Sequence, residues 1–405
     1  MLAGAIQRWG LDRRMAFQTL RRVGTRPNAM IGGFMAATAF ISMWVSNTAT
    51  AAMMLPIALA VIDLVLRRRT GVGLAGHGGI PADAPAERAF ATGLLLCVAY
   101  AASIGGLATI VGSPPNGIVV RYIAQTYGET ITFATWLMIA LPFVLVFLPL
   151  AWWLVTRWLF PSGLPEIEGG RCWVEDELAA LGPMDQGARI TLSVFVATAL
   201  LWMLGPWLAG LEVGGLRPLA GLSDSVVAIL AALALFSLPG GDGRRVVDWE
   251  VARQIPWDVL VLFGGGLSLA AAIERTGVAG YLGSLAGGFA GWPVLVLVLV
   301  VVALTTFMSE LTSNTAQVAT MLPLLAALAP VAGVHPYLLL IPCAFAASAA
   351  FMMPVGTPPN AIVFGTGLIT IGQMCRAGLW LNLCAIALTT ALAFLVIAPI
   401  LIQGR

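Results

Sequence analysis

The chain has 405 residues, of which 59% are apolar and only 10% are charged, with a formal net charge of +2. Soluble domains usually carry about 25% charged residues. Apolar runs of about 20 residues, long enough to cross the roughly 30 Å hydrocarbon layer as helices, recur from end to end. This composition excludes a soluble globular protein. It predicts an all-α polytopic membrane protein that forms a single membrane domain, residues 1–405.

Residue types that enzymes need for catalysis are scarce in this chain. All 21 basic residues are arginine, which excludes a Schiff-base lysine and the lysine of a phosphate-binding loop. The histidines, His77 and His335, fall in predicted loops and are too few for a zinc site or a catalytic triad. The five cysteines form no C-x-x-C pair, and we interpret them as packing residues. We expect no catalytic residues and no nucleic-acid partner.

Three short motifs occur twice, once in each half of the chain. They are Ser-Asn-Thr-Ala at 46–49 and 313–316, Met-Leu-Pro at 54–56 and 321–323, and Gly-Ser/Thr-Pro-Pro-Asn at 112–116 and 356–360. The first two pairs share one offset along the chain, and the third pair has a shorter one. Many transporters are built from two related halves. The sequence therefore predicts an internal duplication, with extra residues of the first half in the Arg-rich stretch 67–89.

Arginine is distributed unequally around the two Ser-Asn-Thr segments. The first is flanked by Arg8, Arg13, Arg14, Arg21, Arg22, Arg26, Arg67, Arg68 and Arg69, whereas the equivalent flanks of the second carry only Arg275. By the positive-inside rule, the first flanks are cytoplasmic and the second external. This predicts inverted repeats, each with a re-entrant helical hairpin whose tip is Ser-Asn-Thr, at about 28–66 and about 291–328. Two ordinary spans with a polar break are the alternative.

The duplication divides the domain into three parts. We place a first repeat at 1–160, a connecting loop with spans at 161–248, and a second repeat at 249–405. Unwound transmembrane helices are expected near 112–116 and 356–360. Residues 249–267 have no counterpart, because their equivalents would precede Met1. We therefore expect a first repeat that is N-terminally incomplete and lacks its first spans; halves that were never equal are the alternative.

The paired motifs contain the residues that a broken helix needs. Backbone breaks inside a bilayer are costly unless they are buried in protein or line a cavity. The oxygens of Ser46 and Asn47 can cap a helix or coordinate a hard cation. In Gly112-Ser113-Pro114, a flexible Gly, an N-cap hydroxyl and a first-turn Pro predict a point where a helix restarts. Four such helix starts, each worth roughly half a positive charge, would suit a dianion, with bound cations supplying further positive charge.

Glu310 is an ionisable residue inside a predicted span, and such residues are functional candidates. It lies four residues before Asn314, and Met43 occupies the equivalent position in the first half. Glu310 could position a cation, carry a proton or make structural hydrogen bonds, and the sequence leaves these alternatives open. Asp63, by contrast, is expected to form an ion pair with Arg67 at a helix end.

Segments 42–50, 309–315 and 354–365 resemble the divalent anion/sodium symporter family, in the solute carrier 13 group. The similarity runs over nearly the whole chain, and the doubled Ser-Asn-Thr motif is its most specific part. The resemblance implies an elevator-type transporter with a scaffold part and a moving transport part. It also implies a homodimer in the cell membrane, a bacterial inner membrane, with Na+ as the coupling ion.

The same resemblance implies the binding residues by motif match. One Na+ site would use Ser42, Ser46, Asn47 and Gly112, and a second would use Ser309, Thr312, Asn314 and Gly356. Substrate carboxylates would meet Asn47, Thr48, Ser113, Asn314, Thr315, Thr357 and Pro358. Several of the cation contacts would be backbone carbonyls, so the side chain matters little at Gly112, Thr312 and Gly356.

The leading functional hypothesis is secondary active transport of C4-dicarboxylates such as succinate, malate or fumarate, coupled to Na+. Within transport, the alternatives are a Na+-independent dicarboxylate exchanger and a carrier of citrate, tartrate or sulfate. A passive channel fits paired hairpins less well than alternating access does. A membrane-embedded enzyme is the minor alternative from another class, because the chain offers no nucleophile with a base.

Overall fold

The computed structural model describes residues 1–71, 73–74, 80–81, 83–167, 169–212, 217–219, 221–241, 243–253 and 291–403, with scattered positions between 254 and 290. These residues are mostly helical, as the composition predicts. The sheet found among them is small, an antiparallel pair of β1 (Pro239–Gly241) and β2 (Arg244–Arg245). Most of residues 254–290, near the start of the predicted second repeat, lie outside the described residues.

The first half of the chain forms two N-terminal helices, a helical hairpin, a broken helix and a long apolar helix. These are α1 (Leu2–Arg8), α2 (Leu11–Val23), α3 (Pro27–Ser42), α4 (Asn47–Thr70), α6 (Pro85–Gly106), α7 (Pro114–Tyr127) and α8 (Phe133–Trp153), which continues as π-helical turns over Leu154–Leu159.

A connecting region and a second hairpin with a second broken helix follow. The connecting region contains α9 (Gly170–Ala180), α10 (Gln186–Ala209), α11 (Asp224–Ser237) and α12 (Trp249–Arg253). The later helices are α15 (Val294–Ser309), α16 (Asn314–Val331), α17 (Tyr337–Ser348), α18 (Pro358–Phe364) and α19 (Ile371–Leu392), which continues as π-helical turns over Ala393–Gln403.

Several of these helices meet the length and composition needed to cross a membrane. Among the described residues six do so, at 47–69, 85–106, 133–159, 186–209, 314–331 and 371–402. Helix α6 is buried along almost its whole length, so it is the central element of the molecule. Helix α10 instead exposes Leu200, Met203 and Trp207. An apolar face of that kind suits contact with lipid.

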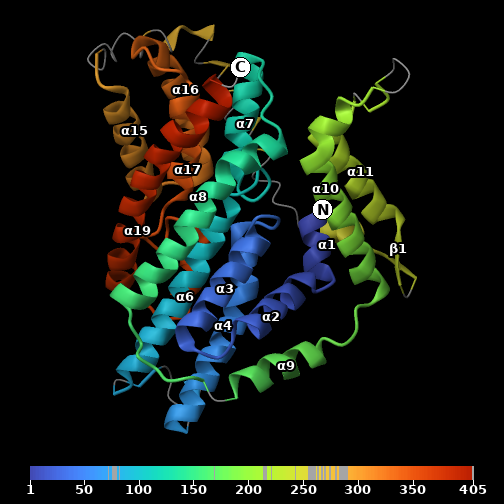
Figure 1. The fold of residues 1–405 in the computed structure, drawn as a ribbon, viewed down its shortest axis with the longest axis vertical. Helices are drawn as coiled ribbons and strands as arrows, with labels where there is room; N and C mark the ends of the chain where they lie inside the picture. The colour runs from blue at the N-terminus through green and yellow to red at the C-terminus, as the bar shows by residue number, and fades with distance from the viewer. Residues whose placement is uncertain are drawn as a thin grey trace.

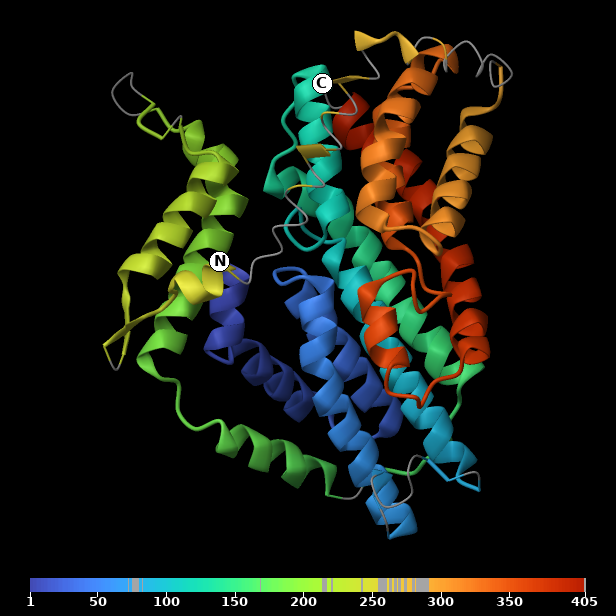
Figure 2. The same ribbon diagram turned by 180° about the vertical axis from the view of Figure 1, so that it is seen from behind.

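Both hairpins are made of two helices joined by a short turn. Helix α3 ends at Ser42, and α4 begins at Asn47 with Ser46 as its N-cap. Helix α15 ends at Ser309, and α16 begins at Asn314. Figures 1 and 2 show α3 and α4 in the lower part of the molecule and α15 and α16 in the upper part, so the hairpins extend from the middle toward opposite ends.

Each hairpin packs against the broken helix of its own half and against the restarted helix of the other half. Helices α3 and α4 contact α6, and α15 and α16 contact α17. Across the halves, α4 contacts α18 and α16 contacts α7. This crossed packing brings the two Ser-Asn-Thr turns and the two helix breaks toward the same region of the protein.

Close backbone contact at glycine sets how tightly α3 lies on α6. A methyl group added at Gly105 would overlap the backbone of Ala39, and one added at Gly378 would overlap the backbone of Phe351. The second contact fixes α19 against the break between α17 and α18. A side chain at either position would push apart elements that carry the candidate site.

Substitution Gly105→Ala is therefore expected to destabilise the protein by about 1–3 kcal/mol, because overpacked cores must shift backbone. Gly93→Ala in the same helix is the matched control, since its methyl group would lie 3.8 Å from the Ile31 side chain, an ordinary contact. Thermal unfolding in detergent measures the difference. Equal melting temperatures for the two variants would contradict this packing.

Candidate substrate and cation site

The turn of the first hairpin places several oxygen atoms close together. Ser42 Oγ donates to the carbonyl oxygen of Ala102 at 2.6 Å. One atom of the Asn47 side-chain amide lies 3.0 Å from that same carbonyl, 3.3 Å from the Gly112 carbonyl oxygen and 2.8 Å from Ser42 Oγ. If this atom is the nitrogen, it donates to all three. The nitrogen is the assignment that satisfies these hydrogen bonds, and the cluster then offers the Ser42, Ala102 and Gly112 oxygens as groups of the kind that a hard cation prefers.

The backbone of the first break is held by two polar side chains. Asn116 Nδ2 donates to the carbonyl oxygens of Gly106 at 3.0 Å, Leu107 at 3.4 Å and Thr109 at 2.8 Å. Thr109 Oγ1 donates to the carbonyl of Met43 in the hairpin turn and accepts from the Gly112 N–H. The freed backbone groups of the first break thereby find hydrogen-bond partners inside the protein, as a helix break within a membrane-spanning segment requires.

The predicted N-cap role of the Ser113 and Thr357 hydroxyls is wrong, although α7 and α18 do begin directly after these residues. Neither side chain makes a capping hydrogen bond. The Pro-Pro pair that follows each contributes to this, because an N-cap oxygen accepts from the second or third helical N–H and the second proline removes the first of these two groups. In α7 the third amide, Asn116 N–H, donates to the Ser113 carbonyl instead. Both hydroxyls are buried, and Thr357 Oγ1 has no hydrogen-bond partner.

The Pro-Pro pairs also change which helix starts can donate N–H groups to an anion. At α7 and α18 the first two positions lack an N–H, so these starts offer the helix dipole and the hydroxyl. At α4 and α16 the first residues are Asn and Thr, which keep their amides. The four helix starts that the sequence suggested are therefore not equivalent: α4 and α16 can donate their first N–H groups, and α7 and α18 cannot.

In the second half, two side-chain oxygens of the predicted sites have no donor. They are Asn314 Oδ1 and Thr357 Oγ1, both buried. Asn360 Nδ2 donates to the carbonyl oxygens of Ala350 at 3.2 Å and Met353 at 3.0 Å, so Asn360 holds the second break as Asn116 holds the first. A buried oxygen without a donor is costly unless something positive approaches it, and a cation meets that need.

The other predicted ligands of the second cation site bond within their own hairpin. Ser309 Oγ donates to the Thr306 carbonyl at 2.8 Å. Thr312 Oγ1 donates to the Met308 carbonyl at 2.9 Å, and it lies 3.1 Å from Gln317 Oε1. These hydroxyls keep lone pairs that can still face a cation.

Among the remaining predicted residues, Gly112 is in close contact with the first hairpin, because a methyl group there would lie 2.9 Å from the Ser42 carbonyl. Ser46 is exposed and caps α4 by accepting from the Ala49 N–H at 3.4 Å. Thr48 and Pro358 are exposed, and Thr315 is half-buried.

Glu310 makes structural hydrogen bonds, one of the alternatives that the sequence left open. Its Oε1 accepts from the backbone N–H groups of Phe351 at 2.8 Å and Met352 at 3.0 Å and from Asn382 Nδ2 at 2.6 Å. Its Oε2 accepts from the Met353 N–H at 2.9 Å. The side chain is buried. Asp63 and Arg67 form the expected ion pair, 2.6 Å apart.

Sequence reasoning missed four residues that hold the breaks together: Thr109, Asn116, Asn360 and Asn382. The repeated Asn at the end of the Pro-Pro-Asn motif was a usable signal for Asn116 and Asn360. Nothing in the sequence marks Asn382, which lies 72 residues from its partner Glu310.

Two cavities bear on where a ligand is held. One of about 630 Å³ reaches the first hairpin turn and includes Trp44, Val45 and Ser46 in its lining, together with Arg8 and Asp248 from α1 and the α12 region. These last two form an ion pair at 2.7 Å, and the hydrogen bond from Arg8 lowers the pKa of the Asp248 carboxyl. Cavities of this size commonly hold small ligands.

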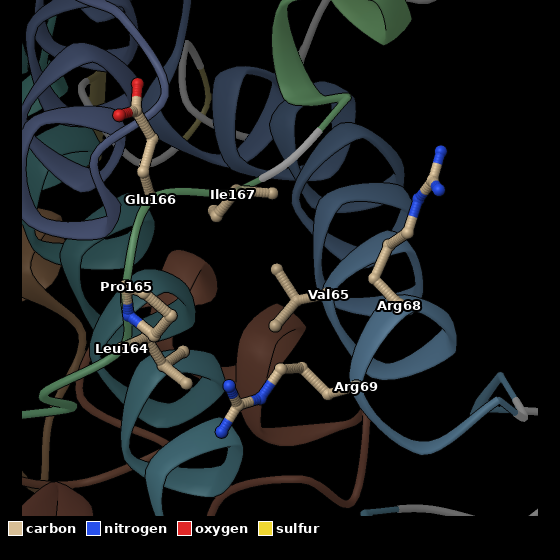
Figure 3. Close-up of a pocket in the computed structure, with 7 residues that line it drawn as sticks. All are labelled: Val65, Arg68, Arg69, Leu164, Pro165, Glu166 and Ile167. Atoms are coloured by element: carbon tan, nitrogen blue, oxygen red, sulfur yellow. The ribbon is translucent and has the colours of Figure 1, made fainter.

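The other cavity, of about 270 Å³, is lined by Val65, Arg68 and Arg69 of α4 and by residues 164–167 (Figure 3). It lies at the far end of α4 from Asn47. A helix of 24 residues is about 36 Å long, which separates this cavity from the hairpin turn.

Asn116→Leu is expected to destabilise the protein by about 1–3 kcal/mol, because the carbonyls of Gly106, Leu107 and Thr109 lose their donor. Asn360→Leu should act in the same direction in the second half. The control is Gln18→Leu, which removes an exposed amide in α2. Thermal unfolding in detergent measures all three. Asn116→Leu as stable as Gln18→Leu would contradict the bonding of the break.

The architecture and the site define a class of protein. Discontinuous helices that meet hairpin turns inside a multi-pass helical protein, next to unpartnered oxygens, are features of secondary transporters. Residues 1–401 match the family model described as the sodium:sulfate symporter transmembrane region, and the chain belongs to that family. It is therefore an integral, multi-pass transporter of the cell membrane and not an enzyme.

Curated relatives match over almost the whole chain. The sodium-dependent dicarboxylate transporter SdcS of Staphylococcus saprophyticus is 38% identical, covering 99% of this chain and 75% of the relative. The SdcS protein of Staphylococcus aureus is 37% identical with the same coverage. Among solved structures, the YdaH transporter of Alcanivorax borkumensis aligns with a TM-score of 0.56 at 16% identity, covering 98% of this chain and 84% of that one. That likeness concerns the fold alone.

Proposed function

We propose that the chain carries C4-dicarboxylates such as succinate, malate and fumarate across the membrane together with Na+. The observation that carries the proposal is the oxygen cluster at the first hairpin turn, where the Ser42 hydroxyl and the Ala102 and Gly112 carbonyl oxygens all lie within 3.3 Å of one atom of the Asn47 side-chain amide. The names of the relatives, sodium-dependent dicarboxylate transporters, support the same coupling ion and substrate class.

In this proposal the first Na+ binds at Ser42, Ser46, Asn47 and Gly112. The Ala102 carbonyl joins this set, because it lies beside both Ser42 and Asn47. The second Na+ binds at Ser309, Thr312, Asn314 and Gly356, where the buried Oδ1 of Asn314 has no other partner. Oxygen ligands from carbonyls, hydroxyls and amides are those that hard cations prefer.

The dianion would be held between the hairpin turns and the breaks. Amide N–H groups at the starts of α4 and α16 would contact one end of the substrate, together with the side chains of Asn47, Thr48, Asn314 and Thr315. The Ser113 and Thr357 hydroxyls, which the Pro-Pro pairs leave free of capping, can donate to carboxylate oxygens, and Pro358 offers apolar contact. Two bound Na+ ions would balance the charge of the substrate, since no arginine lies in any of these motifs.

The transport cycle in this proposal is of the elevator type and rests on inverted repeats. The hairpins extend toward opposite ends of the molecule (Figure 2), and the arginines around the first hairpin favour a cytoplasmic origin for it. Each hairpin would then be re-entrant from its own side. We propose a homodimer in which the part carrying both hairpins moves relative to a fixed scaffold.

Sulfate is the second candidate substrate, because the matching family model is described as a sodium:sulfate symporter region. Sulfate is also a dianion, and the proposed site contains no feature that requires two separate carboxylates. Competition of sulfate against labelled succinate separates the two candidates. A sulfate carrier would lose succinate uptake at sulfate concentrations that leave a dicarboxylate carrier unaffected.

Asn47→Ala and Asn314→Ala are each expected to abolish Na+-driven succinate uptake, because each removes an oxygen ligand of one cation site and a contact to the substrate. Asn28→Ala is the matched control. Asn28 lies at the other end of α3 and accepts from Trp152 Nε1 through its backbone carbonyl, so the substitution should leave uptake near the wild-type rate.

The measurement is initial uptake into proteoliposomes with equal amounts of each inserted protein. Wild-type rates in both asparagine variants would refute the site assignment, even if transport itself were found. Loss of uptake in the Asn28 variant as well would show that the assay reports folding and not binding.

A further inference from the structure

The two helix breaks are held to their hairpins by chemically different groups. In the first half, the Met43 carbonyl accepts from the Thr109 hydroxyl, and Thr109 Oγ1 accepts from the Gly112 N–H at 3.0 Å. In the second half, the residue equivalent to Met43 is Glu310, whose carboxylate accepts from three consecutive backbone N–H groups, Phe351 to Met353. One break is held by neutral groups, and the other is held by a carboxylate.

The hydrogen bonds of Glu310 use the carboxylate as an acceptor throughout. The three backbone groups can only donate, and Asn382 donates its amide nitrogen to Oε1 at 2.6 Å. The orientation of that amide is supported by its oxygen, which accepts from the Phe351 N–H at 3.3 Å. Both oxygens of Glu310 therefore act as acceptors in every one of these contacts.

The carboxylate also lies against the proposed second cation site. A methyl group added at Gly356 would lie 2.9 Å from Glu310 Oε2 and 3.3 Å from the Met353 carbonyl. The Gly356 N–H donates to that carbonyl at 3.1 Å. The path from Glu310 through Met353 to Gly356 is therefore a short chain of direct contacts.

We propose that Glu310 is a positioning residue for the second cation site: its carboxylate fixes backbone 351–353 and thereby Gly356, whereas among the described residues the first break is held to its hairpin by the neutral groups of Met43 and Thr109. This inference rests on the proposed Na+-coupled transport. A full negative charge next to one of two cation sites strengthens cation binding there, because opposite charges attract more strongly in a protein interior than in water. The two sites are consequently unequal in Na+ affinity.

Glu310→Gln is the direct test, because it keeps the shape and removes the charge. One acceptor oxygen becomes an NH2 group facing backbone N–H donors, so the amides of 351–353 should exchange hydrogen faster. The Na+ concentration for half-maximal uptake should rise by about tenfold or more, the effect of losing a single charge-assisted hydrogen bond. The control is Glu87→Gln, which removes another buried carboxylate, one paired with Arg69 near the far end of α4.

Hydrogen exchange and Na+-dependent uptake together distinguish a loss of backbone restraint from a loss of cation binding. Hydrogen exchange followed by mass spectrometry on peptides covering 349–357 does not require transport, and Na+-dependent uptake does. Faster exchange with a raised Na+ requirement, in Glu310→Gln and not in Glu87→Gln, is the expected result. Unchanged exchange in Glu310→Gln would show that Glu310 does not restrain backbone 351–353. Faster exchange with an unchanged Na+ requirement would show that this restraint does not affect the cation site.

If the proposed function itself is wrong, the wild-type protein will show no Na+-dependent uptake. Hydrogen exchange will still test whether Glu310 restrains backbone 351–353. If Glu310→Gln does not fold, Asn382→Ala takes its place. Removal of the Asn382 amide leaves the carboxylate in place with fewer restraints. The same peptide should exchange faster and the Na+ requirement should rise by a smaller factor. Wild-type values for both would overturn the proposal.

Discussion

The structure depends on one constraint, which is that every peptide group at a helix break inside the membrane must find a partner within the protein. Two helices of this chain end in its interior, at Gly106 and Ser348, and restart at Pro114 and Pro358. An unsatisfied peptide group in such surroundings costs several kcal/mol. The side chains of Asn116, Asn360 and Glu310 meet this cost by bonding the freed carbonyls and amides directly.

The same constraint explains why binding groups remain available at the breaks. The Pro-Pro pairs start α7 and α18 without N–H groups in the first two positions, so the preceding hydroxyls have little to cap. Ser113 and Thr357 are thus buried without a capping bond, which leaves their hydroxyls free for the substrate contacts proposed above. The hairpin turns differ, because Asn and Thr keep the amides that an anion can use. In the proposed site, the two kinds of helix start would supply hydroxyl donors, amide donors and cation ligands together.

Repeated motifs made much of this predictable from the sequence. The Ser-Asn-Thr and Gly-Ser/Thr-Pro-Pro-Asn pairs placed helix starts at Asn47, Pro114, Asn314 and Pro358, where the structure has them. Local rules suffice there, because proline and N-cap residues act on their immediate neighbours. The same rules predicted capping by Ser113 and Thr357, and that prediction was wrong: the second proline of each pair removes one of the two amides that can be capped, and in α7 the Asn116 N–H bonds the Ser113 carbonyl instead.

Contacts between distant parts of the chain were beyond the reach of those rules. The bonds from Glu310 to Phe351 and to Asn382 join residues 41 and 72 positions apart, and no local pattern specifies such a pairing. The sequence did show that Glu310 has Met43 as its counterpart, and so that the halves differ there. The structure adds the physical meaning of that difference: a side-chain carboxylate bonds the break in the second half, and a hydroxyl and a backbone carbonyl hold the break in the first.

The central claim, Na+-coupled carriage of a dicarboxylate, is tested most directly by uptake of labelled succinate into proteoliposomes containing the purified chain. An inward Na+ gradient is compared with choline, and empty vesicles with vesicles preloaded with succinate. Na+-coupled carriage predicts uptake that requires Na+ and does not require internal succinate. Uptake that depends on internal succinate and not on Na+ would contradict it and identify an exchanger.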